Sequence, residues 1–329
     1  MTNGTKRIVV LGGGSGGVAA ATRLGRRLGE THSITMVDRR AEHVFMPGFL
    51  FLLVGQRRPE DLVRSLKKLE KRNVRVVQSE VAGIDVDRQR VMLDSGPLPY
   101  DYLIISLGMR TVTDMIPGSE EGGHHAWELD AAVSANRALE SFQGGKVLVG
   151  VPPGPYRCPP GPYETQWLLD SYFRDNDMRD RVQIEYFTPN QEPVGRKDDP
   201  AVYMDKENRD RGITNHYGFS AQSVDPDRRR VNGMYGYSLS YDLLFMVPRH
   251  EPQQVLLDSG LVDSRAGIGV DYSTLATRYE NVFAIGDCAD VPASKSGVVA
   301  HQEADVVAHN IEVAITGRGR PTTLCLHTI

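Results

Sequence analysis

Short apolar runs that end in glycine or aspartate alternate in this chain with longer mixed segments, a pattern typical of an α/β protein. Residues 7–11 are the first such run, and Gly12, Gly14 and Gly17 follow it in G-x-G-x-x-G spacing. Residues 18–24 then have the composition of a helix. A strand, a glycine-rich turn and a helix in this order predict a dinucleotide-binding βαβ unit, because the turn exposes backbone N–H groups to a pyrophosphate.

The second apolar run, residues 33–38, ends in Asp38. A carboxylate at the end of this strand accepts hydrogen bonds from the ribose hydroxyls of an adenosine, and it disfavours the extra phosphate of NADP. The glycine turn and Asp38 together therefore predict FAD or NAD as the ligand, and they are far more specific than the glycines alone.

The remaining pattern continues the alternation of strands and helices. Strands are expected at residues 74–78, 90–93, 101–107, 146–151, 181–187, 241–247 and 281–286, and helices at residues 57–72, 128–142, from about 163, and 296–311. The apolar run at residues 44–54 is expected to pack in a core.

The strand at residues 241–247 resembles the one at residues 101–107, which predicts two related domains. We expect an FAD-binding Rossmann-like domain made of residues 1–112 and 270–329, and a second Rossmann-like domain made of residues 113–269.

Two later strand ends also carry residues suited to a cofactor. Gly108 allows the backbone to leave the sheet close to a ligand, and Gly286 precedes Asp287, whose carboxylate can hold a polyol hydroxyl. Ser296 is expected to cap a helix whose positive end could stabilise an anionic reduced flavin. We expect Lys295 near the pyrimidine edge of that flavin.

The loop that comes after residues 146–151 has a different chemistry. Where a second dinucleotide site needs glycines, it is rich in proline, at Pro152, Pro153, Pro155, Pro159, Pro160 and Pro162. Proline has no N–H to donate, so the loop is a poor phosphate cradle. Cys158 lies within it, and because Pro159 comes next, an extended backbone is expected there. The loop predicts that a thiol has replaced a reduced-nicotinamide site.

Composition narrows the class of protein. The 329 residues are 40% hydrophobic and 24% charged with a net charge of −4, so nothing indicates a nucleic-acid partner. Three cysteines make no secreted disulfide framework, and His124 and His125 have no suitably spaced metal-ligand partners. We see no signal peptide, and the longest apolar run is too short to span a bilayer. A cytoplasmic protein, or one peripheral to the inner membrane, is expected.

Taken together, these features resemble the flavoproteins with two dinucleotide-binding domains, and among them the sulfide:quinone oxidoreductase and flavocytochrome c sulfide dehydrogenase group. The more specific motifs are residues 157–164 (Arg-Cys-Pro-Pro-Gly-Pro-Tyr-Glu), residues 246–250 (Met-Val-Pro-Arg-His) and the segment from Gly286 to Gly297. The resemblance extends from Lys6 to Cys325.

Two departures from the family pattern stand out. Many members have a further cysteine before the second domain, where residues 123–130 have none. The family also continues into an interface region that helps to build a quinone pocket and membrane contacts, whereas this chain ends at Ile329, so that region is expected to be truncated.

The resemblance implies a flavoenzyme chemistry. It pairs Cys158 with Cys325 as a redox-active disulfide, which hydrosulfide attacks to give a persulfide and a thiolate. Arg157 would help to hold the thiolate, and Glu164 would move the proton if burial raised its pKa. Cys288 is expected only to pack. The resemblance also implies FAD as the cofactor and a quinone or a cytochrome c as the electron acceptor, and both a peripheral membrane contact and a homo-oligomer are compatible with this hypothesis.

Three alternatives remain open from the sequence. A sulfide dehydrogenase would donate its electrons to a c-type cytochrome, which the absence of an export signal disfavours. A type-II NADH dehydrogenase would need glycines after Val151, where the chain has prolines. A non-catalytic FAD-binding protein would explain the missing cysteine and the short C-terminus.

Overall fold

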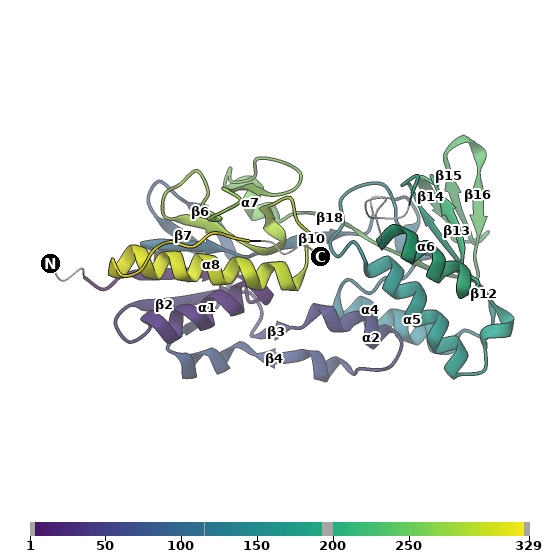
Figure 1. Cartoon of the computed structure of the whole chain (residues 1–329), viewed down its shortest axis with the longest axis horizontal. Helices are drawn as coiled ribbons and strands as arrows, with labels where there is room; N and C mark the ends of the chain where they lie inside the picture. Colours follow the sequence, from purple (N-terminus) through teal and green to yellow (C-terminus); the bar gives the residue numbers. More distant parts are fainter. Residues whose placement is uncertain (1–3, 115, 193–199, 326–329) are drawn as a thin grey trace. The chain divides into compact units, whose positions relative to one another are not determined.

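The computed structural model describes residues 4–114, 116–192 and 200–325. The chain forms two compact units, coloured along the sequence in Figure 1. The first unit comprises Met1–Phe45, Val63–Arg110 and Glu251–Ile329, and the second comprises Met46–Leu62 and Thr111–His250. The expected boundaries differ in that they grouped residues 251–269 with the second domain and residues 46–62 with the first.

A parallel five-stranded sheet forms the centre of the first unit. Its strand order is β20 (Val282–Ala284), β9 (Tyr102–Ile105), β1 (Arg7–Leu11), β2 (Ser33–Asp38) and β5 (Arg75–Gln78). Strand β1 is buried from Ile8 to Leu11, which is the apolar run that the sequence shows. Such continuous burial is expected of a parallel strand whose sheet is covered on both faces.

Helices α1 (Ser15–Leu28) and α8 (Gly297–Thr316) pack side by side in this unit (Figure 1). The other elements of the first unit are β3 (Glu42–Val44), β4 (Val63–Ser65), η3 (Leu66–Arg72), β6 (Val81–Asp85), β7 (Arg90–Leu93), β8 (Gly96–Pro99), α7 (Gln254–Asp258), β19 (Ile268–Gly269), η6 (Gly286–Cys288) and β21 (Ala289–Asp290). Strands β10 (Met109–Val112) and β18 (Arg249–Pro252) contain two of the points where the chain passes between the units.

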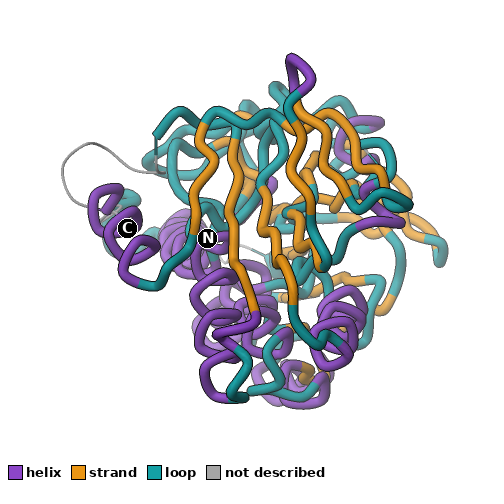
Figure 2. The backbone as a smooth tube through the Cα atoms, turned by 90° about the vertical axis from the view of Figure 1, so that its right-hand side faces the viewer, coloured by secondary structure: helices purple, strands orange, loops and turns teal. Residues whose placement is uncertain are grey.

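The second unit has a parallel sheet of its own, with strand order β13 (Thr214–Tyr217), β12 (Val182–Thr188), β11 (Gly145–Gly150) and β17 (Leu243–Met246). Figure 2 faces this side of the molecule and shows strands that run side by side. The other elements are η1 (Met46–Gly48), α2 (Phe49–Leu53), η2 (Pro59–Leu62), α3 (Ser119–Gly122), α4 (Leu129–Ser141), α5 (Gly161–Asp175), η4 (Arg179–Arg181), α6 (Pro200–Asp210), β14 (Ala221–Asp225), β15 (Arg230–Gly233), η5 (Met234–Gly236) and β16 (Ser238–Ser240).

The two sheets have corresponding topologies. Strand β1 lies between β2 and β9, just as β11 lies between β12 and β17. A three-stranded antiparallel sheet precedes β9 in one unit and β17 in the other. The predicted correspondence of the strands that begin near residues 101 and 241 is therefore seen in the strand order.

The helix predicted at residues 57–72 is wrong. This segment forms η2, strand β4 and η3 instead. Strand β4 pairs with β3, and η3 ends where Asn73 adopts a left-handed backbone with φ of 58°. Pairing with β3 and burial of Leu66 and Leu69 outweigh the helix propensity of a lysine- and leucine-rich segment.

The apolar run at residues 44–54 is only partly a core segment. Phe49, Leu52 and Leu53 of α2 are buried, whereas Phe45 and Phe51 are exposed. None of the helices within the described segments has the length and apolar character that crossing a bilayer requires.

Candidate functional site

The predicted cofactor positions other than Lys295 gather at one edge of the first sheet. The strands are parallel, and Leu11 at the end of β1 is level with Val37 of β2 and Ile105 of β9. Ala284 at the end of β20 is level with Ile105. The glycine turn, Asp38, Gly108 and the Gly286–Asp287 turn all come at or after these strand ends, and ligands bind at this edge of open α/β sheets.

Backbone packing explains why the turn needs glycines. Gly12 has a φ of 98°, and a Cβ on it would lie 2.2 Å from the carbonyl oxygen of Ser106. A Cβ on Gly17 would lie 1.9 Å from the carbonyl oxygen of Gly12. Apart from its immediate neighbours in the chain, none of the described residues has an atom within 4 Å of the corresponding position on Gly14. The first and third glycines therefore close the turn, and the second leaves space in front of the N-terminus of α1.

The carboxylate of Asp38 faces this turn. One oxygen accepts a hydrogen bond from the N–H of Gly13 at 2.5 Å, and the other accepts one from the N–H of Arg40 at 2.7 Å. An ionised carboxylate has further lone pairs, so both oxygens can still accept from ribose hydroxyls. His43, which the sequence did not indicate, lies with Nδ1 2.8 Å from the carbonyl oxygen of Gly13.

The second group of cofactor positions surrounds the N-terminus of α8. Ser296 caps this helix by accepting a hydrogen bond from the N–H of Val299 at 3.4 Å, as expected. The ammonium group of Lys295 donates to the backbone carbonyl of Ala289, and Asp287 is half-buried. Gly286 has a φ of 70°, which lets the backbone turn out of the sheet.

This site fits the dinucleotide part of a flavin cofactor. The open space at Gly14 lies at the uncapped N-terminus of a 14-residue helix, where backbone N–H groups favour phosphate. Carboxylates for hydroxyl groups lie at the ends of two strands of the same sheet. The residues present are therefore those that a pyrophosphate and two polyol groups require.

In the second unit, the proline-rich loop connects β11 to α5. Cys158 has a φ of 60°, so the expectation of an extended backbone is wrong. Its carbonyl accepts a hydrogen bond from the N–H of Gly161 at 2.8 Å, which closes a turn into the helix. This turn overrides the preference for extended backbone before Pro159, and such left-handed residues often mark functional sites.

The sulfur of Cys158 lies at the N-terminus of α5. A Cβ on Gly161, the first residue of this helix, would be 3.4 Å from Sγ. The partial positive charge of a helix N-terminus stabilises a thiolate. Its place at the positive end of α5 therefore gives this half-buried cysteine the environment of a reactive thiol.

Neighbouring side chains hold the loop in place. The indole N–H of Trp127 donates to the carbonyl of Arg157 at 3.2 Å, and the guanidinium of Arg157 donates to the carbonyl of Trp127. The backbone N–H of His250 donates to the carbonyl of Pro155 at 3.0 Å. The reciprocal hydrogen bonds between Trp127 and Arg157, together with the bond from His250 to Pro155, fix the backbone around Cys158.

Titratable groups around the loop have shifted pKa values. Burial raises the pKa of Tyr156 to about 12 and lowers the pKa of His250 to about 3, and both ring nitrogens of His250 have no hydrogen-bond partner among the described residues. The side chain of Glu164 is exposed in the first turn of α5, yet the protein around it raises its pKa. This direction is the one that a proton carrier needs.

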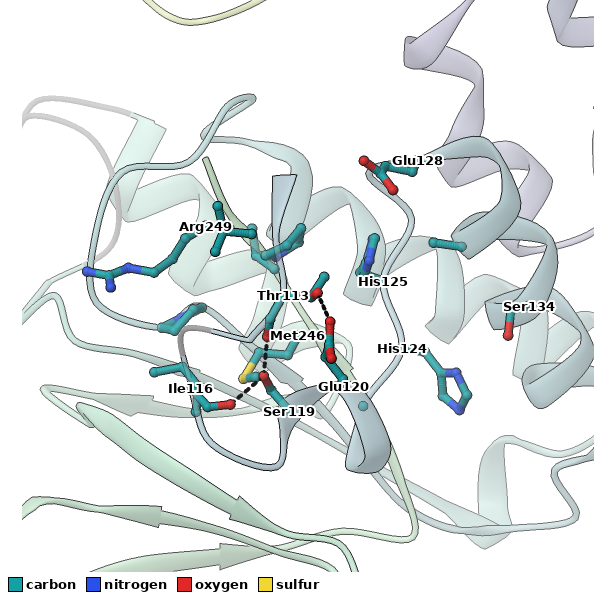
Figure 3. A pocket seen from close by; sticks show the side chains of 16 residues that line it. Thr113, Ile116, Ser119, Glu120, His124, His125, Glu128, Ser134, Met246 and Arg249 are labelled. Carbon is teal, nitrogen blue, oxygen red and sulfur yellow. Dashed lines mark hydrogen bonds between the residues drawn. The ribbon is translucent and has the colours of Figure 1, made fainter. Parts of the chain in front are cut away.

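A cavity of about 340 Å³ lies beside the ends of β11 and β17 (Figure 3). Pro152 and Pro248, which have no backbone N–H to donate, line it, and Glu120 and Glu128 add negative charge. His125 also lines it, and burial lowers the pKa of this residue to about 4. The lining is poorly suited to a pyrophosphate.

The other two cysteines lie in the first unit. Cys288 is buried, and burial raises its pKa to about 11, which fits a packing role. Cys325 is exposed and comes directly after Leu324, whose N–H donates to the carbonyl of Ser273 at 2.7 Å. Because Cys158 is in the second unit, the pairing of Cys158 with Cys325 stays a prediction.

Known proteins share this architecture. The family model of the pyridine nucleotide-disulphide oxidoreductases matches residues 6–150, and that of the central part of the sulfide dehydrogenase (flavocytochrome c) flavoprotein chain matches residues 135–248. The mitochondrial sulfide:quinone oxidoreductase of Mus musculus is 28% identical over 313 residues, which cover 91% of this chain and 69% of that protein.

The sulfide-quinone reductase of Aquifex aeolicus is 25% identical over 334 residues, which cover 93% of this chain and 76% of that protein. The crystal structure of the sulfide:quinone oxidoreductase from Aquifex aeolicus superposes with a TM-score of 0.86 at 24% identity, over 95% of this chain and 78% of that chain.

The resemblance predicted from the sequence is confirmed. The α/β fold is confirmed with it, the chain resembles oxidoreductases of the sulfide:quinone oxidoreductase type over most of its length, and this likeness implies a flavin cofactor. Sequence reasoning gave His250 only as part of a motif, and it missed Ser106, His43 and Glu303 at these sites, because each is brought there from a distant part of the chain.

Proposed function

We propose that this chain is an FAD-dependent sulfide:quinone oxidoreductase in which Cys158 and Cys325 form the redox pair. The observation that carries the proposal is the half-buried thiol of Cys158 at the N-terminus of α5, in the loop that replaces a dinucleotide-binding turn. Sulfide:quinone oxidoreductases similar over most of the chain support the same chemistry.

FAD is the specific form of flavin that we propose. Gly12, Gly14 and Gly17 would hold its pyrophosphate at the N-terminus of α1, and Asp38 would accept the adenosine ribose hydroxyls. Asp287 would hold the other polyol, near Gly108, Gly286 and Lys295. When bound, FAD supplies the two-electron acceptor that a thiol-based oxidation needs.

The protein contributes the sulfur chemistry. Hydrosulfide attacks one sulfur of the Cys158–Cys325 disulfide, so that one cysteine becomes a persulfide and the other leaves as a thiolate. The N-terminus of α5 stabilises negative charge on Cys158, and Arg157 adds a fixed positive charge next to it in the sequence. Both effects stabilise negative charge on the sulfur of Cys158, and they therefore make its thiolate a better leaving group.

Glu164 is the proposed proton carrier. Desolvation by the surrounding protein raises the pKa of its carboxyl group, which is the direction that a proton carrier needs. Its side chain is exposed, so that proton can exchange with solvent.

Anaerobic titration of the purified protein with sulfide tests the reaction directly, because flavin bleaching reports electron transfer. The parent protein should bleach, Cys158→Ser should keep the flavin but lose bleaching by at least about a hundredfold, and Cys325→Ser should behave alike. Cys288→Ser is the matched control and should bleach at the parent rate. A Cys158→Ser protein that is reduced at the parent rate would refute the proposed function.

The acceptor is proposed to be a quinone. The match to a flavocytochrome c flavoprotein chain over residues 135–248 favours a cytochrome c as the second candidate. Reoxidation of the sulfide-reduced protein by a soluble ubiquinone analogue and by oxidised cytochrome c, measured in parallel, distinguishes the two. A peripheral membrane contact and a homo-oligomer, proposed with the quinone, can be tested by liposome flotation and light scattering.

A further inference from the structure

Glu303 is an acid in an unusual place. It lies on α8 in the first unit, and its side chain is only 1% exposed. Carboxylates are rarely buried so completely, because removing a charge from water is costly unless a partner or a function compensates. The proposed cofactor contacts do not include it, so its burial needs another reason.

Its hydrogen bond provides that reason. One carboxylate oxygen of Glu303 accepts a hydrogen bond from the backbone N–H of Gly286 at 2.5 Å. Gly286 comes after strand β20, has a φ of 70°, and directly precedes Asp287. The bond therefore joins a 20-residue helix to the turn that carries Asp287.

The same residues surround a small cavity at this point. Gly286, Asp287, Lys295 and Glu303 line it together. The charged groups that act on Glu303 are Lys295, which favours its ionised form, and Asp287, which disfavours it. Lys295 is itself anchored to the carbonyl of Ala289. The arrangement places a buried acid beside the turn that carries the proposed polyol-binding carboxylate.

We propose that Glu303 is a positioning residue of the flavin site, which holds the Gly286–Asp287 turn in the shape that the cofactor requires. The inference rests on the proposed binding of FAD and adds a residue that acts through the turn rather than by touching the cofactor. A buried hydrogen bond that a backbone N–H donates to a carboxylate is charge-assisted, and it is roughly twice as strong as a bond to a neutral acceptor.

The protonation state of Glu303 should consequently affect cofactor affinity. Burial raises the pKa of Glu303 to about 7. Above that pH the ionised carboxylate holds the N–H of Gly286 strongly, and below it the neutral acid holds it more weakly. FAD should therefore bind more tightly at pH 8 than at pH 6, by about tenfold.

The test is release of FAD from the purified holoprotein, followed by flavin fluorescence on dilution at pH 6 to 8.5. In Glu303→Gln an amide oxygen can accept the same bond but does not titrate, so its affinity should not share the pH dependence of the parent. Glu303→Ala leaves the N–H without its acceptor and should bind FAD about tenfold more weakly at every pH. Glu312→Gln, on the same helix and ion-paired to Arg27, is the matched control and should follow the parent.

A Glu303→Gln protein with the full pH dependence of the parent, or a Glu303→Ala protein with parental affinity, would overturn the proposal while FAD binding itself stands. If Glu303→Ala does not fold, the comparison of parent and Glu303→Gln still decides. A parent protein that binds no FAD would refute the proposed cofactor and this inference with it.

Discussion

In both units of this protein, an equivalent hydrogen bond holds the residue that follows the central strand of the sheet. The N–H of Gly12 donates to the carbonyl of Val37 at 2.8 Å, and the N–H of Val151 donates to the carbonyl of Phe187 at 3.0 Å. Each of these bonds ties the residue after a central strand to the neighbouring strand. The two sheets therefore present their central strand ends in the same way.

The correspondence extends to the start of the same strands. The carboxylate of Asp101 accepts from the backbone N–H of Arg7 at 2.7 Å, and that of Asp242 accepts from the N–H of Lys146 at 2.8 Å. Asp101 and Asp242 come directly after buried tyrosines, Tyr100 and Tyr241. Such agreement is expected of two copies of one ancestral unit.

The difference between the units lies in the connection after the central strand. In the first unit residues 12–14 lead directly into α1, whereas in the second unit residues 151–160 intervene before α5. The short turn exposes backbone N–H groups, and the long loop replaces them with prolines and the thiol of Cys158. The connection, rather than the sheet, therefore decides whether a unit is suited to a dinucleotide or to sulfur.

The largest effect that could break this comparison is reduction by NADH. A nicotinamide dinucleotide in the second unit would lack two or three backbone donors, each worth about 1 kcal/mol, so NADH should bleach the flavin roughly thirtyfold to a hundredfold more slowly than sulfide. Stopped-flow absorbance with each reductant measures the ratio. Bleaching by NADH as fast as by sulfide would mean that the proline loop does not exclude a dinucleotide.

Substituting Gly12 tests the short turn. In Gly12→Ala the new Cβ would meet the carbonyl oxygen of Ser106, in a backbone conformation with positive φ. We expect a loss of more than about 3 kcal/mol in the free energy of unfolding, together with loss of bound flavin. Urea unfolding and the visible spectrum report both. Gly83→Ala, where the Cβ meets only Met92 at 3.9 Å, is the control and should change stability by less than about 0.5 kcal/mol.

The paired aspartates test whether the common framework has the same strength in both units. Asp101→Ala and Asp242→Ala each remove an acceptor from a backbone N–H, and each should cost about 1 kcal/mol of unfolding free energy. Thermal unfolding of the two variants gives the comparison. A large cost in one unit and none in the other would contradict the correspondence.

Asp101 also predicts a pH dependence. Hydrogen bonding to Arg7 lowers the pKa of Asp101 below its ordinary value of 3.8. A lowered pKa in the folded state stabilises the protein above about pH 4, and this contribution is lost as the pH falls through the lowered pKa. Asp101→Asn should therefore lose less stability than the parent between about pH 4 and pH 2 in acid-unfolding experiments.

The smallest effect concerns the hairpin ion pairs. Arg88 pairs with Asp85 in the first unit, and Arg228 pairs with Asp225 in the second, both across turns on the surface. Because both arginine side chains are largely exposed, Arg88→Ala and Arg228→Ala should each change the melting temperature by less than about 2 °C. A larger change in calorimetry would show that these turns contribute to the core.

The sequence predicted the strands and the helix cap correctly, but it did not predict the local backbone geometry of two segments. Residues 7–11 and 33–38 form the strands that their apolar runs indicated, and Ser296 caps a helix as expected. Residues 57–72 do not form the predicted helix, because β4 pairs with β3 and local helix propensity does not account for such pairing. Cys158 does not have the predicted extended backbone, because a hydrogen-bonded turn into α5 sets its conformation.

By itself, the sequence determined the alternation of strands and helices, the glycine turn with Asp38, and the thiol in a proline-rich loop, since each depends on residues close together in the chain. Only the tertiary structure decided that Ser106 closes the turn on Gly12, that His250 holds the loop at Pro155, and that Glu303 lies behind Gly286. These contacts join residues that are distant in sequence. The packing of whole strands and helices, rather than a local pattern, brings them together.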